Sequence, residues 1–434
     1  MPKVMPFRGV RYDPGRVGDL ARVTAPPYDM ISAAEQDELH ARDPHNIVRL
    51  ILGRERDGGG PVDRYATSAA CYRRWREEGA LLQEAAPSFY LYREDYTAGG
   101  RSYERLGLVA RVALEEFGGG GAFAHESTMA GPKADRLRLL LACRANFSQI
   151  FALYSDPEGE VEGPLVAATA ADPLLAFDDG RGVRHSLWRV DDPGLIGRVA
   201  AAMAGRPFII ADGHHRYETA LEFRRLMRQD PDTFRESYDA TLMCLVRMES
   251  PGLTILPFHR LLVAPAPERM LERLAAAFDL EERELPTDRT AYAGAIGGLL
   301  GGEPGARPTF GVCRGGGRVT LMTMKPGFDP RSLMRPGTSA QLAELDATLL
   351  HQAVFEGLLG LDEQALVQAG GIRYFNRPEE AAAEVEAGRG PAVFFLRPTR
   401  IDQVWRIATS GQRMPQKSTN FYPKLISGLV INEL

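Results

Sequence analysis

Residues 207–220 have the sequence Pro-Phe-Ile-Ile-Ala-Asp-Gly-His-His-Arg-Tyr-Glu-Thr-Ala, in which a short apolar run ends in a dense polar cluster. The run from Phe208 to Ile210 is typical of a buried strand, and Gly213 permits a tight turn. Beyond the turn, apolar residues recur at helical spacing, at Tyr217, Ala220, Phe223 and Met227. The stretch therefore predicts a strand that turns directly into a helix.

The polar cluster of this stretch lies where the helix is predicted to begin. A helix N-terminus presents unpaired backbone N–H groups and a partial positive charge. The imidazoles of His214 and His215 and the guanidinium of Arg216 add hydrogen-bond donors suited to phosphate. We therefore predict an anion or phosphoryl site here. The alternative is a satisfied polar turn, in which Arg216 pairs with Asp212 or Glu218.

The length of the chain predicts two domains, because 434 residues exceed what one hydrophobic core normally supports. The pattern becomes looser near residue 265, which favours an N-terminal domain over 1–265 and a C-terminal α/β portion over 266–434. The segment 414–430 is rich in lysine, hydroxyl and aromatic residues, and we expect this tail to return to a cleft. A docked terminal strand over 425–430 is compatible with the same sequence.

The composition describes an ordinary soluble protein, with 44% hydrophobic and 25% charged residues. The chain has no apolar run long enough to span a membrane, and its N-terminus lacks the apolar core of a signal peptide, so a cytoplasmic location is expected. A net charge of −5 argues against a protein that binds bare duplex DNA. The four cysteines have no spacing suited to zinc or redox exchange, and we expect them to be buried.

Local patterns predict the remaining elements. Ser32 and Glu35 form a capping box that begins a helix at Ala33. Two runs that flank Ala-Gly-Gly-Arg predict a long β-hairpin. The predicted strands are 4–12, 46–52, 89–97, 102–114, 150–154, 241–248 and 253–262, with a second hairpin over 310–324 and helices over 134–145, 268–278 and 292–300. The fold class is α/β with mixed strand pairing.

A second polar cluster follows the glycine run 118–121. It contains His125 and Glu126, and then Lys133 and Arg136, whose spacing of three residues places them on one helix face. Glu126 or Asp212 is a candidate ligand for Mg²⁺, which uses few protein carboxylates. A surface loop of salt bridges is the alternative. In the tail, Lys417 and Lys424 are candidates for phosphate contacts, and Ser418 and Thr419 for orienting a small polar substrate.

Six short motifs in order resemble the bacterial domain of unknown function 1015 family, which supplies no function. They are Pro6-Phe-Arg-Gly-Val-Arg-Tyr12, Val23-Thr-Ala-Pro-Pro-Tyr-Asp29, Asn46-Ile-Val-Arg-Leu50, His125-Glu126 with Gly131-Pro-Lys133 and Asp135-Arg136, Asp212-Gly-His-His-Arg-Tyr217, and Met414-Pro-Gln-Lys-Ser-Thr419. The resemblance runs nearly from end to end of the chain.

The Asp-Gly-His-His-Arg turn also resembles the Gly-x-x-Arg phosphate box of the ParB and sulfiredoxin superfamily, which includes kinases acting on free serine. The resemblance implies a mixed-sheet core with large elaborations. It further implies close backbone approach at Gly213 and phosphate contacts from His214, His215 and Arg216. His214 stands where sulfiredoxins have their reactive cysteine, and no helix-turn-helix module is recognisable. Sulfiredoxin chemistry and DNA clamping are therefore not expected.

These observations predict a phosphotransferase that uses ATP or ADP with Mg²⁺ and acts on a small hydroxyl compound, resembling a free serine kinase. Asp29 is the predicted general base, because Pro26 and Pro27 stiffen the loop that presents it. The predicted catalytic residues are Asp29, Asp212 and His214. The phosphate contacts are Gly213, His214, His215, Arg216, Lys133, Arg136, Lys417, Ser418 and Thr419, and the substrate contacts are Tyr28, His125 and Glu126.

Three alternatives remain open at this point. Asp29 can instead serve the helix cap close to Ser32. The protein can be a nucleotide-sensing module without turnover. It can also be a metal-dependent hydrolase built on His125, His214 and His215, although adjacent histidines rarely ligate one ion together. The expected partners are a nucleotide and a small molecule rather than a membrane or nucleic acid, and a homodimer is left open.

Overall fold

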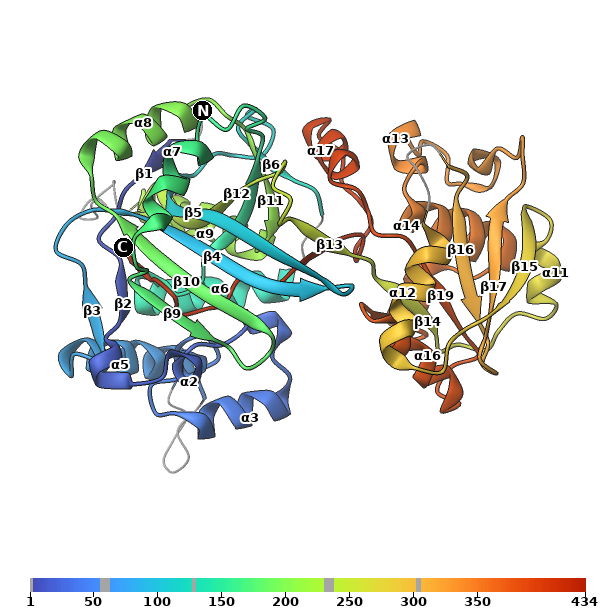
Figure 1. The fold of residues 1–434 in the computed structure, drawn as a ribbon, viewed down its shortest axis with the longest axis horizontal. Coiled ribbons are helices and arrows are strands. Elements are labelled where there is room, and N and C mark those ends of the chain that lie inside the picture. Colours follow the sequence, from blue (N-terminus) through green and yellow to red (C-terminus); the bar gives the residue numbers. More distant parts are fainter. Residues whose placement is uncertain (1–2, 55–62, 127–129, 230–237, 302–305) are drawn as a thin grey trace. The chain divides into compact units, whose positions relative to one another are not determined.

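The computed structural model describes residues 3–54, 63–126, 130–229, 238–301 and 306–434 (Figure 1). The chain divides into two compact units. The first unit comprises residues 1–254 and 423–434, and the second comprises 255–422. The division falls at residue 254 rather than near 265, because strand β14 (His259–Leu262) is hydrogen-bonded into the second unit's sheet. The last twelve residues of the chain belong to the first unit, not to the C-terminal portion.

A nine-stranded mixed sheet forms the centre of the first unit, with the order β6-β11-β8-β12-β5-β4-β10-β9 and β1 paired to β5. The β6–β11 and β8–β12 pairs are parallel, and the others are antiparallel. This arrangement confirms the predicted mixed α/β fold. The strands are β1 (Val4–Met5), β4 (Phe89–Ala98), β5 (Arg101–Ala113), β6 (Ala122–Ala124), β8 (Ile150–Tyr154), β9 (Leu175–Asp178), β10 (Val183–Val190), β11 (Phe208–Asp212) and β12 (Ala240–Arg247).

The apolar residues of the central strands are almost completely buried. Phe208 and Ile210 of β11 join a core that also holds Ile150, Met243 and Tyr217. Helix α9 (His214–Met227) packs against helix α6 (Ala130–Cys143), which in turn packs against α5 (Arg64–Glu77). The burial of strand β11 and of helix α9 fixes the turn between them, and this turn carries the polar cluster.

Several local predictions differ from the structure. The predicted strand 4–12 is divided into β1 and β2 (Val10–Tyr12), which belong to different sheets, and the predicted helix 268–278 is limited to α11 (Met270–Leu274). Residues 46–52 form helix α4 (Val48–Ile51) and not a strand, because Asn46 Oδ1 accepts a hydrogen bond from the backbone N–H of Val48 at 2.9 Å and thereby starts a helical turn. Pro257 separates β13 (Thr254–Leu256) from β14. Residues 425–430 make only an isolated bridge at Ser427, and the terminal strand is β21 (Asn432–Glu433). The hairpin β4–β5 and the helix α3 (Ala33–Arg42), capped by Ser32, are confirmed.

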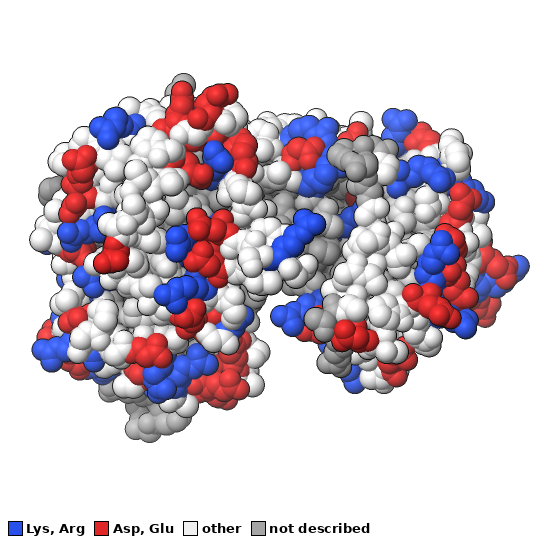
Figure 2. Space-filling view, in the orientation of Figure 1, with Lys and Arg blue, Asp and Glu red and all other residues white. Residues whose placement is uncertain are grey.

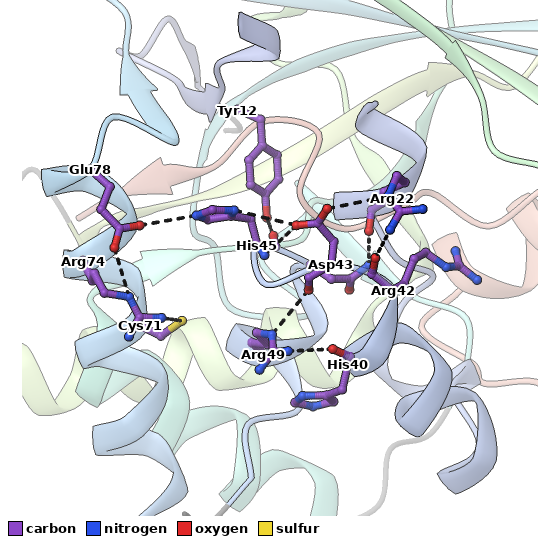
Figure 3. A network of polar contacts seen from close by, with 11 residues as sticks. Tyr12, Arg22, His40, Arg42, Asp43, His45, Arg49, Cys71, Arg74 and Glu78 are labelled. Carbon is purple, nitrogen blue, oxygen red and sulfur yellow. Dashed lines mark hydrogen bonds and ion pairs between the residues drawn. The ribbon is translucent and has the colours of Figure 1, made fainter. Parts of the chain in front are cut away.

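A polar network joins the N-terminal helices to strand β2 (Val10–Tyr12) (Figure 3). The hydroxyl of Tyr12 donates to the carbonyl oxygen of His45 at 2.7 Å. The imidazole of His45 lies 3.3 Å from a carboxylate oxygen of Glu78 and 3.7 Å from one of Asp43. The ring of His45 also packs on Trp75, with the centroids 5.5 Å apart. The network positions the segment that follows α3 against helix α5.

The second unit is built on a six-stranded antiparallel sheet of order β15-β17-β16-β19-β14-β18. The strands are β15 (Phe278–Glu284), β16 (Thr309–Cys313), β17 (Arg318–Met324), β18 (Ile372–Phe375) and β19 (Ala392–Phe395), together with β14. The predicted hairpin over 310–324 is confirmed by β16 and β17. A long π-helical segment, η4 (Leu349–Leu359), packs its apolar side into the core of this unit.

The face drawn in Figure 2 carries side chains of both charge signs. Figure 2 shows Lys and Arg side chains interspersed with Asp and Glu, so that neither sign forms a continuous area on the face drawn. Among the described residues no helix is both long and apolar enough to cross a membrane. All four cysteines are buried, as predicted, and none forms a disulfide.

Candidate anion-binding site at the sheet edge

The candidate site lies where strands β11 and β6 end side by side. The two strands are parallel, with Ile210 paired to Ala124, so their carboxyl ends meet at one edge of the sheet. Asp212 ends β11, and His125 follows β6 directly. Helix α9 begins at His214, immediately after Gly213. The strand-turn-helix unit predicted from residues 207–220 is therefore confirmed.

Gly213 is required by the shape of this turn. Its φ of 90° lies in the left-handed region, which favours glycine. A Cβ atom at this position would also lie 2.9 Å from the guanidinium of Arg216. The side chain of Arg216 therefore folds back over the glycine, where it donates to the carbonyl oxygen of Gln149 and to Asp212 Oδ2, the latter at 2.7 Å. Among the described residues, the buried Nε of Arg216 has no hydrogen-bond partner.

Two cations converge on the carboxylate of Asp212. Arg216 binds one oxygen at 2.7 Å, and Lys424 Nζ binds the other at 2.7 Å. Burial by itself would raise the pKa of Asp212, but Lys424 and then Arg216 outweigh burial and hold this pKa at about 2. The pair of Arg216 with Asp212 matches the polar turn that was the alternative from the sequence. Lys424, however, is a second cation that binds the same carboxylate.

His125 and His215 contribute hydrogen-bonding groups rather than charge to this edge. His125 is 1% exposed, and its Nδ1 lies 2.7 Å from the carbonyl oxygen of Ile210, so Nδ1 carries the proton. Burial, together with the nearby Lys424, lowers the pKa of His125 to about 4. Its ring meets that of His214 edge to face at 4.8 Å. Burial also lowers the pKa of His215. His125 and His215 are therefore neutral near pH 7.

A small cavity of about 60 Å³ adjoins the turn, and Tyr28, Arg136 and Arg216 line it. The guanidinium carbon of Arg136 lies 4.0 Å from the ring centroid of Tyr28. Burial, reinforced by the charge of Asp29, raises the pKa of Tyr28 to about 12. The structure thus brings together three of the residues predicted for nucleotide and substrate contacts.

Asp29 itself is exposed in a short 3-10 turn, η1 (Tyr28–Met30). Its negative charge raises the pKa of Tyr28 and opposes the lowering of the pKa of His215. The helix cap at α3 is made by Ser32, whose Oγ accepts from the N–H of Glu35 at 3.2 Å. The capping alternative for Asp29 therefore has no support in the geometry.

The remaining predicted contacts are distributed over both units. Lys133 pairs with Glu218 at 2.8 Å and so links α6 to α9. Glu126 is half-buried directly after His125. Lys417, Ser418 and Thr419 belong to the second unit, where Ser418 Oγ donates to the carbonyl oxygen of Pro415 at 2.6 Å. A role for 417–419 in nucleotide binding stays a prediction.

The carboxylates at the turn do not fit a magnesium ion as they are arranged. Both oxygens of Asp212 are bound to cations, and a metal ion would have to displace Lys424 or Arg216. Across the described parts of the chain, no three His, Cys, Asp or Glu side chains are close enough together to hold a metal. The zinc site built on His125, His214 and His215 is therefore not formed.

Gln149 is a site residue that the sequence reasoning missed. Its carbonyl oxygen accepts from Arg216, and its side chain is 1% exposed and donates to the carbonyl oxygen of Ile426 at 3.2 Å. The side-chain Oε1 is buried and lacks a partner among the described residues. The only signal in the sequence was its position directly before the predicted strand 150–154. This strand runs antiparallel to β11, so its first residues lie at the same sheet edge as Asp212.

Comparisons with known proteins place the chain in a family without assigning it an activity. No curated protein matches the chain. Similar solved structures include a conserved hypothetical protein from Pyrococcus furiosus, with 14% identity over 70% of this chain and 88% of that one at a TM-score of 0.31. A free serine kinase in complex with AMP has 12% identity over 69% and 83% at a TM-score of 0.32. SbnI with a C-terminal truncation from Staphylococcus aureus has 8% identity over 74% and 85% at 0.33.

The family assignment rests on a match along most of the chain. A family model described as "Protein of unknown function (DUF1015)" matches residues 4–348, which include the Asp-Gly-His-His-Arg turn and both polar clusters of the first unit. This match confirms the family that the ordered motifs indicated and covers the first five of them, whereas the sixth motif, at 414–419, lies outside the matched residues. The chain belongs to the DUF1015 family.

Proposed function

We propose that the turn from Asp212 to Arg216 binds the phosphates of a nucleotide, and that the protein transfers a phosphoryl group from ATP or ADP to a small hydroxyl compound. The observation that carries the proposal is the convergence of Lys424 and Arg216 on one carboxylate at the N-terminus of helix α9. Such a site already stabilises an anion, and a phosphate group is an anion with more charge and more acceptor oxygens.

The helix supplies further donors for a phosphate. Helix α9 is 14 residues long, its N-cap is Gly213, and no side chain caps its first turn. This turn lies at the positive end of the helix dipole, where a phosphate can accept hydrogen bonds from backbone N–H groups. A phosphate that displaces the carboxylate of Asp212 would keep both cationic contacts and add these N–H groups.

The proposed chemistry uses the neighbouring residues for positioning and proton transfer. Asp29 takes the proton of the acceptor hydroxyl, and the hydroxyl oxygen attacks the terminal phosphorus as the bond to the leaving phosphate breaks. Arg216 and Lys424 neutralise the charge on the transferred group. Since the carboxylates at the turn do not fit Mg²⁺, no step is assigned to a metal.

One observation favours nucleotide binding without turnover as a second candidate. Asp29 is exposed, and none of the described residues forms a hydrogen bond or ion pair with it. A general base is usually held in place by such partners. A nucleotide sensor needs the phosphate site but not a positioned Asp29, so the two candidates differ in a measurable way.

Replacement of Arg216 by Ala is expected to abolish the thermal stabilisation that a nucleotide gives. A ligand that binds the native protein raises Tm, and loss of a charge-assisted contact to phosphate weakens affinity by about 10- to 100-fold. The measurement is a thermal-shift panel of ATP, ADP, CTP, GTP and pyrophosphate with and without Mg²⁺, repeated with free serine. Arg225→Ala is the matched control, because Arg225 is an exposed arginine of the same helix. Equal shifts in both variants would contradict the assigned site.

Replacement of Asp29 by Asn is expected to lower turnover by about 100-fold or more while nucleotide affinity is retained, because general-base catalysis contributes on this scale. The measurement is phosphoryl transfer to the acceptor, with binding followed separately by calorimetry. Asp37→Asn serves as the control, since Asp37 is an exposed carboxylate of helix α3. Turnover that survives in Asp29→Asn would remove this residue as the base. Binding without turnover in the unaltered protein would favour the sensor.

A further inference from the structure

A cavity in the second unit is lined by residues other than those of the turn at Asp212. It has a volume of about 440 Å³, within the roughly 300–1,000 Å³ typical of small-molecule sites. The Met414-Pro-Gln416 part of the tail motif forms part of its wall. The motif was predicted from the sequence to line a cleft, and the proposed function of the first unit leaves these three residues without a role.

The floor of the cavity is buried and polar. Thr348 is 1% exposed and His351 is fully buried, and both line the cavity. Among the described residues, the Oγ1 of Thr348 has no hydrogen-bond partner. A buried hydroxyl without a partner is costly, which favours a ligand or water that binds it. Thr348 occupies the N-cap position of the π-helical segment η4 without a capping hydrogen bond from its side chain, and π-helical turns occur frequently at functional sites.

A buried arginine fixes the hydrogen-bonding state of His351. Arg260, 1% exposed, donates from Nε to the Nε2 of His351 at 3.0 Å. Since Nε2 accepts this bond, the ring proton of His351 resides on Nδ1, which makes that atom a donor. This guanidinium also donates to the carbonyl oxygens of Phe258 and Lys417, and its carbon lies 5.6 Å from the ring of Tyr374, another wall residue. Its positive charge therefore stands directly behind the wall.

The rim is cationic and amide-rich, with an apolar component. Arg335 and Arg413 contribute guanidinium groups, although Arg335 also binds Glu356 at 3.0 Å. Four of the lining residues are glutamines, and none of the described lining residues is Asp or Glu. Val367, 47% exposed, supplies apolar surface. The two arginines of the rim outnumber Glu356, the carboxylate that binds Arg335, and this balance favours anions. The apolar and amide groups favour an organic body.

We infer that this cavity is a second ligand site, which binds a small organic anion carrying a phosphate or a carboxylate group. The anionic group is held by Arg413 and Arg335 at the rim, and Thr348 and the Nδ1–H of His351 donate to the part of the ligand that enters the floor. The site is independent of the proposed nucleotide site, because all its residues belong to the second unit.

The test is a thermal-shift and calorimetric titration of the full chain with inorganic phosphate, AMP and citrate at millimolar concentrations. It is done in an Arg216→Ala background, so that the first unit's site does not contribute. At least one probe is expected to raise Tm. A response to phosphate and AMP identifies a phosphate-bearing ligand, and a response to citrate alone identifies a carboxylate. The absence of a response to all three would overturn the inference.

Two substitutions separate a ligand site from a structural pocket. Thr348→Val keeps the shape but deletes the hydroxyl, so it should leave the Tm of the unliganded protein unchanged or higher while weakening the probe about three- to tenfold. Arg413→Gln should weaken the probe about tenfold or more. Arg406→Gln, an exposed arginine of helix α17 (Ile401–Thr409), is the control and should bind normally. Equal affinity in all three variants, or a lower Tm of unliganded Thr348→Val, would overturn the assignment.

Discussion

Replacement of Arg105 by Met is expected to destabilise the protein by about 3–5 kcal/mol, because it leaves a buried carboxylate without its partner. Arg105 and Glu94 are each 1% exposed, and Arg105 Nε donates to Glu94 Oε2 at 2.9 Å. The guanidinium also donates to the carbonyl oxygen of Pro423 at 2.5 Å and stacks 4.7 Å from the ring of Phe151. One side chain thus joins the hairpin β4–β5 to the returning tail.

The pH dependence of the Arg105→Met variant follows from the burial of Glu94. Burial already raises the pKa of Glu94, and the charge of Arg105 opposes that rise. Without Arg105 the pKa of Glu94 rises further, so the loss of stability is greatest at high pH and diminishes as pH falls and Glu94 takes up a proton.

Urea unfolding at several pH values measures both effects of the Arg105→Met substitution. Arg101→Met, at an exposed position of the same strand, should stay within about 0.5 kcal/mol of the unaltered protein. A double variant that also carries Glu94→Leu should recover stability relative to Arg105→Met, because the unpaired charge is gone. Equal stability of Arg105→Met and Arg101→Met would show that the pair contributes nothing.

Replacement of Asp212 by Asn is expected to have two effects of opposite sign. It should destabilise the unliganded protein by roughly 2–3 kcal/mol, because Lys424 and Arg216 lose the charge that compensates them. It should also raise the affinity for inorganic phosphate or pyrophosphate by about tenfold, since the anion no longer competes with a resident carboxylate. The first effect expresses the structural role of Asp212, and the second expresses the proposed role of the turn.

The pH profile gives an independent readout of Asp212. The folded-state pKa of Asp212 is about 2, below the ordinary value of 3.8. The stabilisation from its charge, roughly 2 kcal/mol, is therefore fully present above pH 4 and is lost as pH falls toward about 2. In Asp212→Asn, the free energy of unfolding should therefore lack this decrease as the pH falls from about 4 to about 2.

The control for Asp212→Asn is Asp239→Asn, and the pH dependence of unfolding is compared between the two variants. Asp239 also pairs with an arginine, but its side chain is 39% exposed, so the comparison isolates the effect of removing a buried carboxylate. An Asp212→Asn variant that is destabilised but gains no affinity for phosphate or pyrophosphate would show that Asp212 is only structural. That result would count against the phosphate site.

The sequence alone was sufficient to predict the elements whose signals are local. The apolar run from Phe208 to Ile210 and the spacing after Gly213 predicted β11, the left-handed turn and α9. The Ala-Gly-Gly-Arg turn predicted the hairpin β4–β5. The family membership also followed from short ordered motifs. These features depend on periodicity, glycine conformation and helix capping, which act between residues close together in the chain.

The prediction was misled in two apolar segments whose composition resembles that of a strand. The apolar run around residues 46–52 matches a strand by composition, yet the side chain of Asn46 donates to the carbonyl oxygen of Arg22 at 2.7 Å and holds a helical turn in place. The tail 425–430 is apolar enough for a strand, but it makes only an isolated bridge in the first unit. At Asn46, hydrogen bonds to the carbonyl oxygens of Arg22 and Thr24, which are distant in the sequence, add to the local hydrogen bond with Val48.

The chemistry of the candidate site also depended partly on the local sequence and partly on the tertiary structure. The residue types of the turn, and hence its suitability for an anion, were determined by the sequence between Asp212 and Arg216. Only the tertiary structure brought Lys424 onto Asp212 across 212 residues of chain, placed Gln149 beneath Arg216, and kept His125 neutral by burying it. Charge neutralisation and desolvation depend on distances in space. The sequence therefore determined which groups were available, and the fold decided which of them are charged, paired and close enough to act.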